Sequence, residues 1–441
     1  MTSKTAPSPE TSPLRIPNFR AYWLSRLSMT LAQYAMMLII GWQTYNIARD
    51  SGMSVAESSG QLALIGLLQF VPLFILTPFS GWAADHFDRR NLGRLTVLLQ
   101  LVCAGLLAWL TWTDAVSLPW IFGVAILLGI ARAFAGPALS ALAPNLVPKA
   151  ILPNAIALSS ISWQVGMIVG PAVGGYTYAI FPSLPYITAA ALFLVSITAL
   201  SFIGKVPQPP RPQNQRPIHA MVEGLRYVVR NKMVLGAITL DLFAVFLAGA
   251  TALFPVYARD ILQVGETGLA QLAMAPAVGA ALTALYFSFR PLKTNVGPKM
   301  LWAVALFGLA TIIFGFSTSM PLSLAMLFIV GAADMFSVYI RQSLIQLHTP
   351  DEKRGRVSSV SLLTISASNE FGDFFSGSLA YAIGPVAAVV TGGTGAIITV
   401  AMWAKIFPVL RTTRTFDPPE ELQEQPVRKT PPEEELQEQL P

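Results

Sequence analysis

Apolar residues occur in long blocks along this chain, and short polar or proline-containing segments separate the blocks. A helix that crosses the hydrocarbon core of a bilayer needs about 20 mostly apolar residues, and twelve blocks are long enough. Their length and their lack of period-two alternation predict transmembrane helices rather than a β-barrel. The predicted spans are 20–46, 61–82, 92–112, 117–142, 153–180, 184–204, 233–258, 268–289, 299–317, 320–343, 357–382 and 385–408.

Between the sixth and seventh blocks the pattern changes. The segment opens with Val-Pro-Gln-Pro-Pro-Arg-Pro, which favours an extended linker. A helix-compatible apolar face follows, which predicts an amphipathic surface helix that joins two halves. The last residues hold two similar acidic, proline-rich stretches and are predicted to be disordered. The predicted parts are a cytoplasmic N-terminal tail at 1–17, a six-helix bundle at 18–204, the cytoplasmic linker at 205–232, a second six-helix bundle at 233–410 and a cytoplasmic tail at 411–441.

Charge sets the orientation of the chain. Only 12% of the residues are charged and 54% are hydrophobic, whereas soluble domains carry about 25% charged residues. This composition excludes a chain that is disordered throughout and argues against a soluble enzyme. With the N-terminus inside, the outside loops hold only Arg49 and Arg259 among the basic residues. The other Lys and Arg residues between blocks then lie inside, so both termini are expected in the cytoplasm. The net charge of +6 therefore reflects membrane orientation and does not indicate nucleic-acid binding.

Several short matches relate the two halves of the sequence. Arg49-Asp50 recurs as Arg259-Asp260, and Gln-Leu-Ala at 61–63 recurs at 271–273, both after 210 residues. Later matches follow after 202 residues and include two glycines in the fifth and eleventh blocks. The ordered series predicts a duplication of six helices plus six, a plan in which the substrate site lies between the halves.

The sequence carries no pattern for a cofactor, a metal or an enzymatic reaction. Cys103 is the only cysteine, so neither a disulfide framework nor a cysteine metal site is possible within one chain. The three histidines have no metal-ligand spacing, and no Walker A loop is present to bind ATP. We expect no cofactor, no metal site and no enzymatic activity.

The segment after the second block combines a glycine with charged residues, namely Gly81, Asp85, Asp88, Arg89 and Arg90. A glycine, an aspartate four residues later and paired basic residues resemble the signature loop of the major facilitator superfamily. Gly81 would allow two helices to approach, and Asp85 would accept a hydrogen bond from Arg89 or cap a neighbouring helix. Such contacts imply a conformational latch on the cytoplasmic side. Asp88 replaces a glycine of the family and resembles the branch of enterobactin exporters and macrolide efflux pumps. The alternative is an ordinary charged loop that obeys the positive-inside rule.

The fifth block holds Gly166, Gly170, Pro171, Gly174 and Gly175. They match every defined position of the antiporter motif of the same superfamily, GxxxGPxxGG. Small residues on one face permit close helix contact, and the proline bends the helix. The resemblance implies an exporter. A generic packing face of small residues is the alternative.

Ionisable residues inside a membrane are costly and are functional candidates. Away from their ends, the predicted spans contain Arg26, Arg132, Asp241, Asp334, Glu370 and Asp373. We hypothesise that one or more of the four acids binds a coupling proton, because a membrane-embedded acid can exchange a proton near neutral pH. The alternatives are a structural ion pair and a helix cap in contact with cavity water.

The resemblance also implies a cavity lined by the first, fourth, seventh and tenth helices. Arg132 and Asp334 are repeat equivalents and would then lie on opposite cavity walls. Arg132 resembles the basic residue of the family's fourth-helix motif, which implies contact with an anionic substrate. Arg26 either lies in the cavity or extends to the cytoplasmic surface. Weaker cavity candidates, for which simple packing is the alternative, are Gln33, Tyr34, Met37, Trp163, Gln164 and Phe243.

The resemblance covers residues 18–410 and implies the major facilitator fold, an all-α membrane protein with twelve transmembrane helices in two pseudo-symmetric six-helix bundles. It implies a monomeric, proton-coupled secondary active transporter of the bacterial inner membrane. We expect it to export a small amphipathic molecule, such as a siderophore or a drug-like compound, by alternating access. An importer or facilitator of the same class of molecule is one alternative. A non-transporting membrane receptor or assembly partner is the other.

Overall fold

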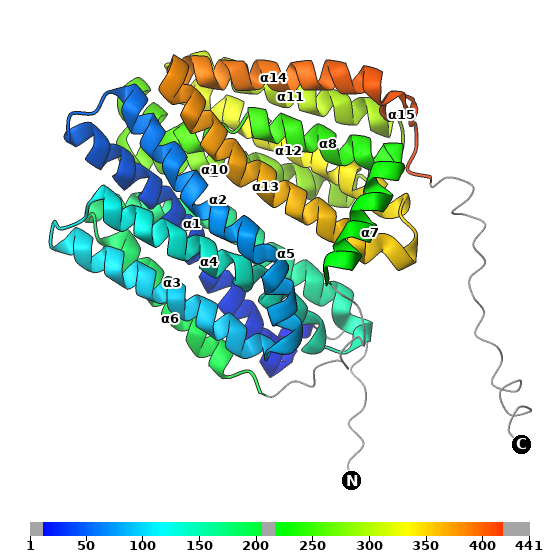
Figure 1. The fold of residues 1–441 in the computed structure, drawn as a ribbon, viewed down its shortest axis with the longest axis horizontal. Helices are drawn as coiled ribbons and strands as arrows, with labels where there is room; N and C mark the ends of the chain where they lie inside the picture. The colour runs from blue at the N-terminus through cyan, green and yellow to red at the C-terminus, as the bar shows by residue number, and fades with distance from the viewer. Residues whose placement is uncertain (1–11, 205–216, 418–441) are drawn as a thin grey trace, which may run out of the picture.

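The computed structural model describes residues 12–204 and 217–417, and these ranges contain helices and turns but no strand. Two sets of six long helices lie beside each other (Figure 1). The first set is α1 (Pro17–Asp50), α2 (Val55–His86), α3 (Arg89–Trp112), α4 (Leu118–Leu142), α5 (Leu152–Ile180) and α6 (Leu184–Ser201). The second set is α8 (Lys232–Leu247), α10 (Gly265–Phe289), α11 (Val296–Phe316), α12 (Met320–Leu347), α13 (Asp351–Ile383) and α14 (Pro385–Ile406). The predicted fold class is confirmed.

Shorter elements connect the long helices. They are η1 (Pro13–Arg15), η2 (Ala143–Asn145), η3 (Lys149–Ile151), α7 (Pro217–Arg230), η4 (Ala250–Leu253), α9 (Phe254–Val256), η5 (Tyr257–Ile261) and α15 (Pro408–Thr412). The helix predicted in the linker is therefore present as α7. Most of the predicted N-terminal tail, the proline-rich start of the linker and the predicted disordered tail from 418 onwards lie outside the described residues.

Local sequence explains where several helices begin. Ser54 and Glu57 form a capping box at the start of α2, because each side chain bonds the backbone amide of the other residue. Asp88 caps α3 by accepting from the amide of Arg90 at 2.9 Å. Asn231 caps α8 in the same way. These caps satisfy amide groups that have no partner within the helix.

The seventh membrane crossing differs from the single helix predicted over 233–258. α8 ends at Leu247, and η4, α9 and the π-helix η5 continue the crossing to Ile261. A Cβ added to Gly249 would lie 3.2 Å from the carbonyl carbon of Gly372 in α13. The helix is therefore interrupted where another backbone comes close, and the apolar local sequence contains no signal for it.

The buried side chains of the described residues form three cores. One core lies within the first set of helices and a second lies within the second set. The third core joins both sets: Trp42, Tyr45 and Leu62 pack with residues that include Tyr257 and Leu269. We call the end that holds the first and last described elements, η1 and α15, the terminal end and the other the opposite end (Figure 1). The third core lies at the opposite end, where α1 turns into α2.

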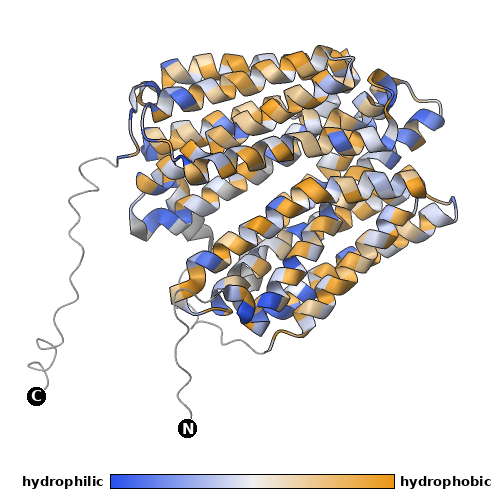
Figure 2. Ribbon diagram, turned by 180° about the vertical axis from the view of Figure 1, so that it is seen from behind, coloured by the Kyte–Doolittle hydropathy of each residue, from blue (hydrophilic) through white to orange (hydrophobic). Residues whose placement is uncertain are grey.

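The surface of the bundle is suited to lipid. Ten helical stretches among the described residues are long and apolar enough to cross a membrane. Large apolar side chains are exposed on the outside, such as Trp302 at 76% and Phe289 at 78%. Contact of so much apolar surface with water would be unfavourable. Hydrophobic residues dominate the helices in Figure 2, and hydrophilic ones gather towards their ends. The chain is a multi-pass membrane protein.

Candidate functional site

A buried ion pair links two helices of the second set. Asp241 of α8 and Arg341 of α12 are 6% and 3% exposed, and their charged groups are in direct contact. A lone charge in such surroundings would be strongly unfavourable, so each side chain stabilises the charge of the other. Asp241 was predicted as a site residue. Arg341 was not, because it lies two residues before the end of the predicted span.

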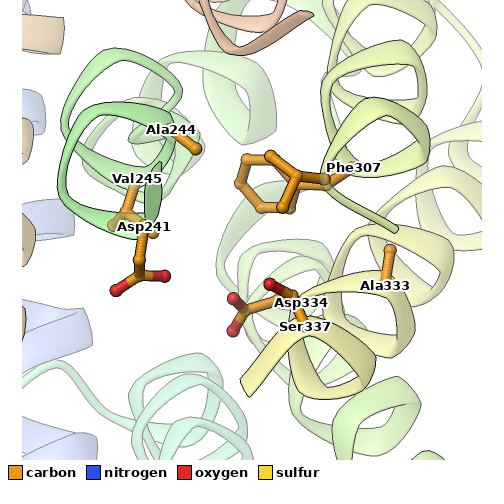
Figure 3. A pocket seen from close by; sticks show the side chains of 8 residues that line it. Asp241, Ala244, Val245, Phe307, Ala333, Asp334 and Ser337 are labelled. Carbon is orange, nitrogen blue, oxygen red and sulfur yellow. The ribbon is translucent and has the colours of Figure 1, made fainter. Parts of the chain in front are cut away.

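A second acid lies beside this pair. Asp334, Ser337 and Arg341 are three and then four residues apart, so they share one face of α12. Asp334 and Asp241 line the same small cavity (Figure 3). The cavity measures about 10 Å³, close to the roughly 10–15 Å³ that one water molecule requires. Two carboxyl groups therefore lie near a single guanidinium. The heptad spacing of Asp334 and Arg341 is the sequence signal that could have identified this cluster.

The acids predicted on α13 are placed differently. Asp373 accepts a hydrogen bond from Thr251 of η4 at 3.0 Å, so it lies at the interrupted seventh crossing. For Glu370 the structure describes the helical backbone but not the side chain. The predicted shared face of these two acids therefore stays a prediction.

The two predicted arginines lie in the first set of helices. Arg132 of α4 donates to the side-chain oxygen of Gln69 in α2 at 3.2 Å, and Gln69 is buried. The Nε atom of Arg26 in α1 is buried and has no hydrogen-bond partner among the described residues. An unsatisfied buried donor costs about 1–3 kcal/mol, so Arg26 would gain from a ligand or water that accepts from it.

The weaker cavity candidates fall into two groups. Gln33 donates to Gln100 at 2.6 Å within the first set, and Phe243 packs on Trp403 at 5.1 Å between ring centres. Partly or largely exposed side chains remain on α1 and α5. They are Tyr34, Met37, Trp163 and Gln164, of which Met37 and Trp163 are 40% and 44% exposed.

An aromatic cluster lies where three helices from both sets meet. Phe371 of α13 lies 5.5 Å from Phe70 of α2 and 5.5 Å from Phe246 of α8, between ring centres. The Phe246 and Phe371 rings are nearly parallel, at 13°. These residues were not predicted, because the sequence does not distinguish phenylalanines at such a site from those that simply pack inside apolar blocks.

The glycines of the fifth-block motif allow α5 to lie close to α1. A Cβ added to Gly166, Gly170 or Gly174 would come within 2.6–2.7 Å of atoms of α1. Real Cβ contacts are never so short, so any larger residue would separate the helices. Pro171 lies inside α5 and is buried between these glycines.

Two further glycines hold the halves together. A Cβ on Gly175 of α5 would lie 2.5 Å from the Cβ of Ala270 in α10. A Cβ on Gly377 of α13 would lie 2.8 Å from the Cβ of Ala63 in α2. Gly175 and Gly377 are repeat equivalents, so the helix pairs α5–α10 and α2–α13 join the two sets in equivalent ways.

Crossed ion pairs join the two sets at the opposite end. Nη2 of Arg49 lies 3.1 Å from Oδ1 of Asp260, and Nη2 of Arg259 lies 2.5 Å from Oδ1 of Asp50. Tyr45 also donates to Asp260 at 2.5 Å. In the sequence, Arg49-Asp50 and Arg259-Asp260 indicated only a duplication. Each repeat in fact supplies the partner charges of the other.

The predicted latch residues lie at the terminal end. Arg90 contacts Asp88 through two hydrogen bonds at 2.6 and 3.1 Å and donates to the carbonyl of Ile203 at 3.0 Å. The hydrogen bonds from Arg90 hold the pKa of Asp88 below its ordinary value. These contacts stay within the first set of helices. Arg89 is partly buried, whereas for Gly81 and Asp85 the structure describes only the helical backbone of α2.

Two similar sets of six membrane-crossing helices, with ionisable groups buried inside and ion pairs at one end of their interface, define a membrane transporter. The family comparison agrees. The chain belongs to the Major Facilitator Superfamily, whose family model matches residues 22–372. The resemblance found in the sequence is therefore confirmed, and a transporter of this family implies a small-molecule substrate.

Curated relatives cover most of the chain. It is 30% identical over 352 residues to the multidrug efflux pump Tap of Mycobacterium tuberculosis, a match that covers 76% of this chain and 78% of Tap. It is 25% identical over 413 residues to the enterobactin exporter EntS of Escherichia coli, with 91% and 94% covered.

Solved structures share the fold. A bacterial homologue of the human lysosomal transporter Spinster, inward-facing and unoccupied, gives a TM-score of 0.67 at 17% identity, with 90% of this chain and 99% of that chain covered. The inward-open xylose transporter XylE of Escherichia coli gives 0.65 at 14% identity, with 90% and 97% covered.

Proposed function

We propose that this protein is a proton-coupled exporter of a small amphipathic molecule in a bacterial inner membrane, with both termini in the cytoplasm. One observation carries the proposal: the two sets of helices share a core and ion pairs at the opposite end, whereas each has its own core elsewhere. A transporter that alternates access needs one end closed at a time. The relatives named as a multidrug efflux pump and an enterobactin exporter support export.

Charge supports the proposed orientation. The described residues begin and finish at the terminal end (Figure 1), and the basic residues between helices concentrate there, as the positive-inside rule requires of a cytoplasmic end. The opposite end would then face the periplasm. The closed opposite end corresponds to an inward-facing state, and two neighbours in the same fold are described as inward-facing or inward-open.

We propose that the helices at 18–204 and 233–410 move as two units that the 205–232 segment connects. In the outward-facing state the crossed ion pairs would separate and the terminal end would close. Gly81, Asp85 and Arg89 would then form the latch at that end. Asp88 and Arg90 already pair within the first unit, so we assign them the role of fixing the loop between α2 and α3.

The cluster of Asp241, Asp334 and Arg341 is the proposed proton site. One guanidinium can neutralise one carboxylate, so the cluster becomes neutral when the second carboxyl group binds a proton. A proton that binds at Asp241 would release Arg341, and one that binds at Asp334 would leave the ion pair intact. Asp373 and Glu370 on α13 remain further candidates for the coupling proton.

The substrate site is proposed between the units, near Arg26 and Arg132 on one side. The buried Nε of Arg26 lacks an acceptor, which suits a substrate with an anionic or phenolic oxygen. Tyr34, Met37, Trp163 and Gln164 would add polar and apolar surface, with Gln33 behind them. An amphipathic molecule needs both kinds of contact. Phe243 already packs on Trp403, so we assign it a packing role.

Transport into everted proteoliposomes tests this function. The purified monomeric protein would be reconstituted with its terminal end outside, the lumen acidified, and enterobactin or the amphipathic dye rhodamine 6G added outside. We expect substrate uptake that collapses with a protonophore and release of protons from the lumen. The variants Asp241→Asn, Asp334→Asn, Glu370→Gln and Asp373→Asn separate the coupling candidates. If all four retain full proton-driven transport, the proposed coupling is wrong.

A further inference from the structure

The helix α7 (Pro217–Arg230) packs on the membrane-spanning helices with one face only. Gly224 lies so close to α13 that an added Cβ would come 2.8 Å from the carbonyl oxygen of Arg356. Glu223 pairs with Arg356 at 2.5 Å. Tyr227 donates to the carbonyl of His348 at 2.7 Å. These contacts fix both the position and the rotation of α7.

The docked face of α7 also buries Val228, which is 2% exposed. The opposite face of α7 is apolar as well, and no described residue covers it. Val222, Leu225 and Val229 are 46%, 51% and 57% exposed. They are three and four residues apart, so they form one stripe along the helix. A helix in water would normally direct polar residues outward. Two apolar faces therefore indicate that the outer face meets something other than water.

Charge and depth indicate which partner the stripe meets. Arg226 and Arg230 are exposed and lie along one edge of the stripe. The carbonyl of Arg356, which α7 touches, is in the first turns of α13. This is the depth at which a membrane-spanning helix enters the headgroup region. In Figure 1, α7 crosses the ends of α8 and α13 at a steep angle to them, so its axis runs along the membrane surface rather than through it.

We propose that the outer face of α7 is a binding surface for anionic phospholipids of the leaflet at the terminal end. The apolar stripe enters the boundary between headgroups and acyl chains, and Arg226 and Arg230 contact phosphate groups. Because α7 is held by α13 and also contacts α8 and α2, lipid bound to it lies next to helices of both sets. This proposal does not depend on the orientation of the protein proposed above, which determines only whether the leaflet at the terminal end is the cytoplasmic one.

The test uses the full-length protein with Leu225→Cys carrying a polarity-sensitive fluorophore; the native Cys103 is buried and 1% exposed. The labelled protein is reconstituted in phosphatidylcholine vesicles, with or without phosphatidylglycerol. We expect quenching by lipids that carry a nitroxide near the headgroup and protection from aqueous iodide. Phosphatidylglycerol should strengthen both effects. Val229→Cys provides a second label position if the first variant folds poorly.

Charge removal separates specific lipid binding from general attraction. Arg226→Gln with Arg230→Gln should abolish the added effect of phosphatidylglycerol, whereas Lys405→Gln with Arg411→Gln, which removes two exposed charges elsewhere at the terminal end, should preserve it. Full access of iodide without lipid quenching would overturn the proposal. So would protection that rises with protein density in the vesicles, because a second copy would then cover the stripe. Equal effects of the two charge removals would contradict the anionic contact. None of these results depends on transport activity.

Discussion

Asp241 and Arg341 lie side by side inside a membrane-spanning bundle, where an isolated charge has neither water nor a counter-ion. Asp334 adds a second acid to the same small cavity. The three residues therefore have different expected roles. Arg341 and Asp241 stabilise each other, whereas Asp334 is available to exchange a proton without breaking that ion pair.

The stability of the variants distinguishes these roles. Asp241→Asn leaves Arg341 without its contact and should lower the free energy of unfolding by about 3–5 kcal/mol. Asp334→Asn keeps the ion pair of Asp241 and Arg341. It should change the free energy of unfolding by less than about 1 kcal/mol, because no buried partner loses its counter-charge. Thermal unfolding in detergent measures both. Asp241→Asn combined with Arg341→Met should recover much of the loss. Equal destabilisation by the two single variants would contradict the assignment.

We expect His348 to give the docking of α7 a pH dependence. Burial at the end of α12 lowers the pKa of His348 below its ordinary value of 6.5. We expect separation of α7, whose Tyr227 donates to the backbone carbonyl of His348 at 2.7 Å, to expose the ring. The pKa would then rise towards that value, so the separated form would bind the proton more readily. The docked form is therefore favoured fully above about pH 6.5 and progressively less as the pH falls below it. Hydrogen exchange over 222–230 should accelerate at acid pH, and His348→Gln should remove the dependence. An unchanged profile in His348→Gln would contradict this reasoning.

Single site residues could be predicted from the sequence where an ionisable side chain lies inside an apolar span, because such residues are rare in membranes. Asp241 and Asp334 were found in this way, and both line the cavity. Arg341 was missed because a basic residue near the end of a span satisfies the positive-inside rule equally well. The partners of such residues depend on how helices pack, which the sequence does not specify.

Among the helices, the contact of α5 with α10 shows how small residues fix the interface between the two sets. Gly175 allows the backbone of α10 to approach, and its equivalent Gly377 does the same for α2. Both contacts lie towards the closed end. A larger residue at either position should therefore weaken that end in particular, rather than destabilise its own set of helices.

Gly175→Ala tests this interface. Its Cβ would meet Ala270 at 2.5 Å, and overpacking of this kind costs about 1–3 kcal/mol. We expect the closed opposite end to open more often, which cysteine accessibility near the ends of α5 and α10 measures. Gly105→Ala is the matched control, because no atom lies within 4 Å of the added Cβ. Equal accessibility in the two variants would show that Gly175 has no part in closure.

The helices themselves were largely predictable. The twelve apolar blocks correspond to the twelve long helices, ten of which lie in described stretches long and apolar enough to cross a membrane. The pattern of apolar residues also identified the helix in the linker. The interruption after Leu247 was not predictable, since Ala248, Gly249 and Ala250 fit an apolar helix as well as a break. The close backbone of α13 that accompanies the break is more than a hundred residues away in the sequence.

For the whole molecule, the duplicated sequence produces an interface with two unequal ends. Arg49-Asp50 and Arg259-Asp260 occupy equivalent places, so each arginine reaches the aspartate of the other repeat. The duplication was visible in the sequence, but the ion pairs between the two repeats were not. Ion pairs that are partly exposed, as these are, contribute little individually. They are therefore suited to an end that opens and closes, as the proposed function requires.

The central claim is that the two ends open in alternation. Spin labels on Asn91→Cys and Lys293→Cys report the terminal end, and labels on Thr113→Cys and Thr318→Cys report the opposite end; all four positions are exposed. Pulsed electron-electron measurements give the distance within each labelled pair. Comparing each pair with and without the additional substitutions Arg49→Ala and Arg259→Ala tests the claim most directly. We predict that removal of the arginines lengthens the distance across the opposite end and shortens the distance across the terminal end. If both distances lengthen together, or neither changes, the two sets of helices do not alternate and the account is wrong.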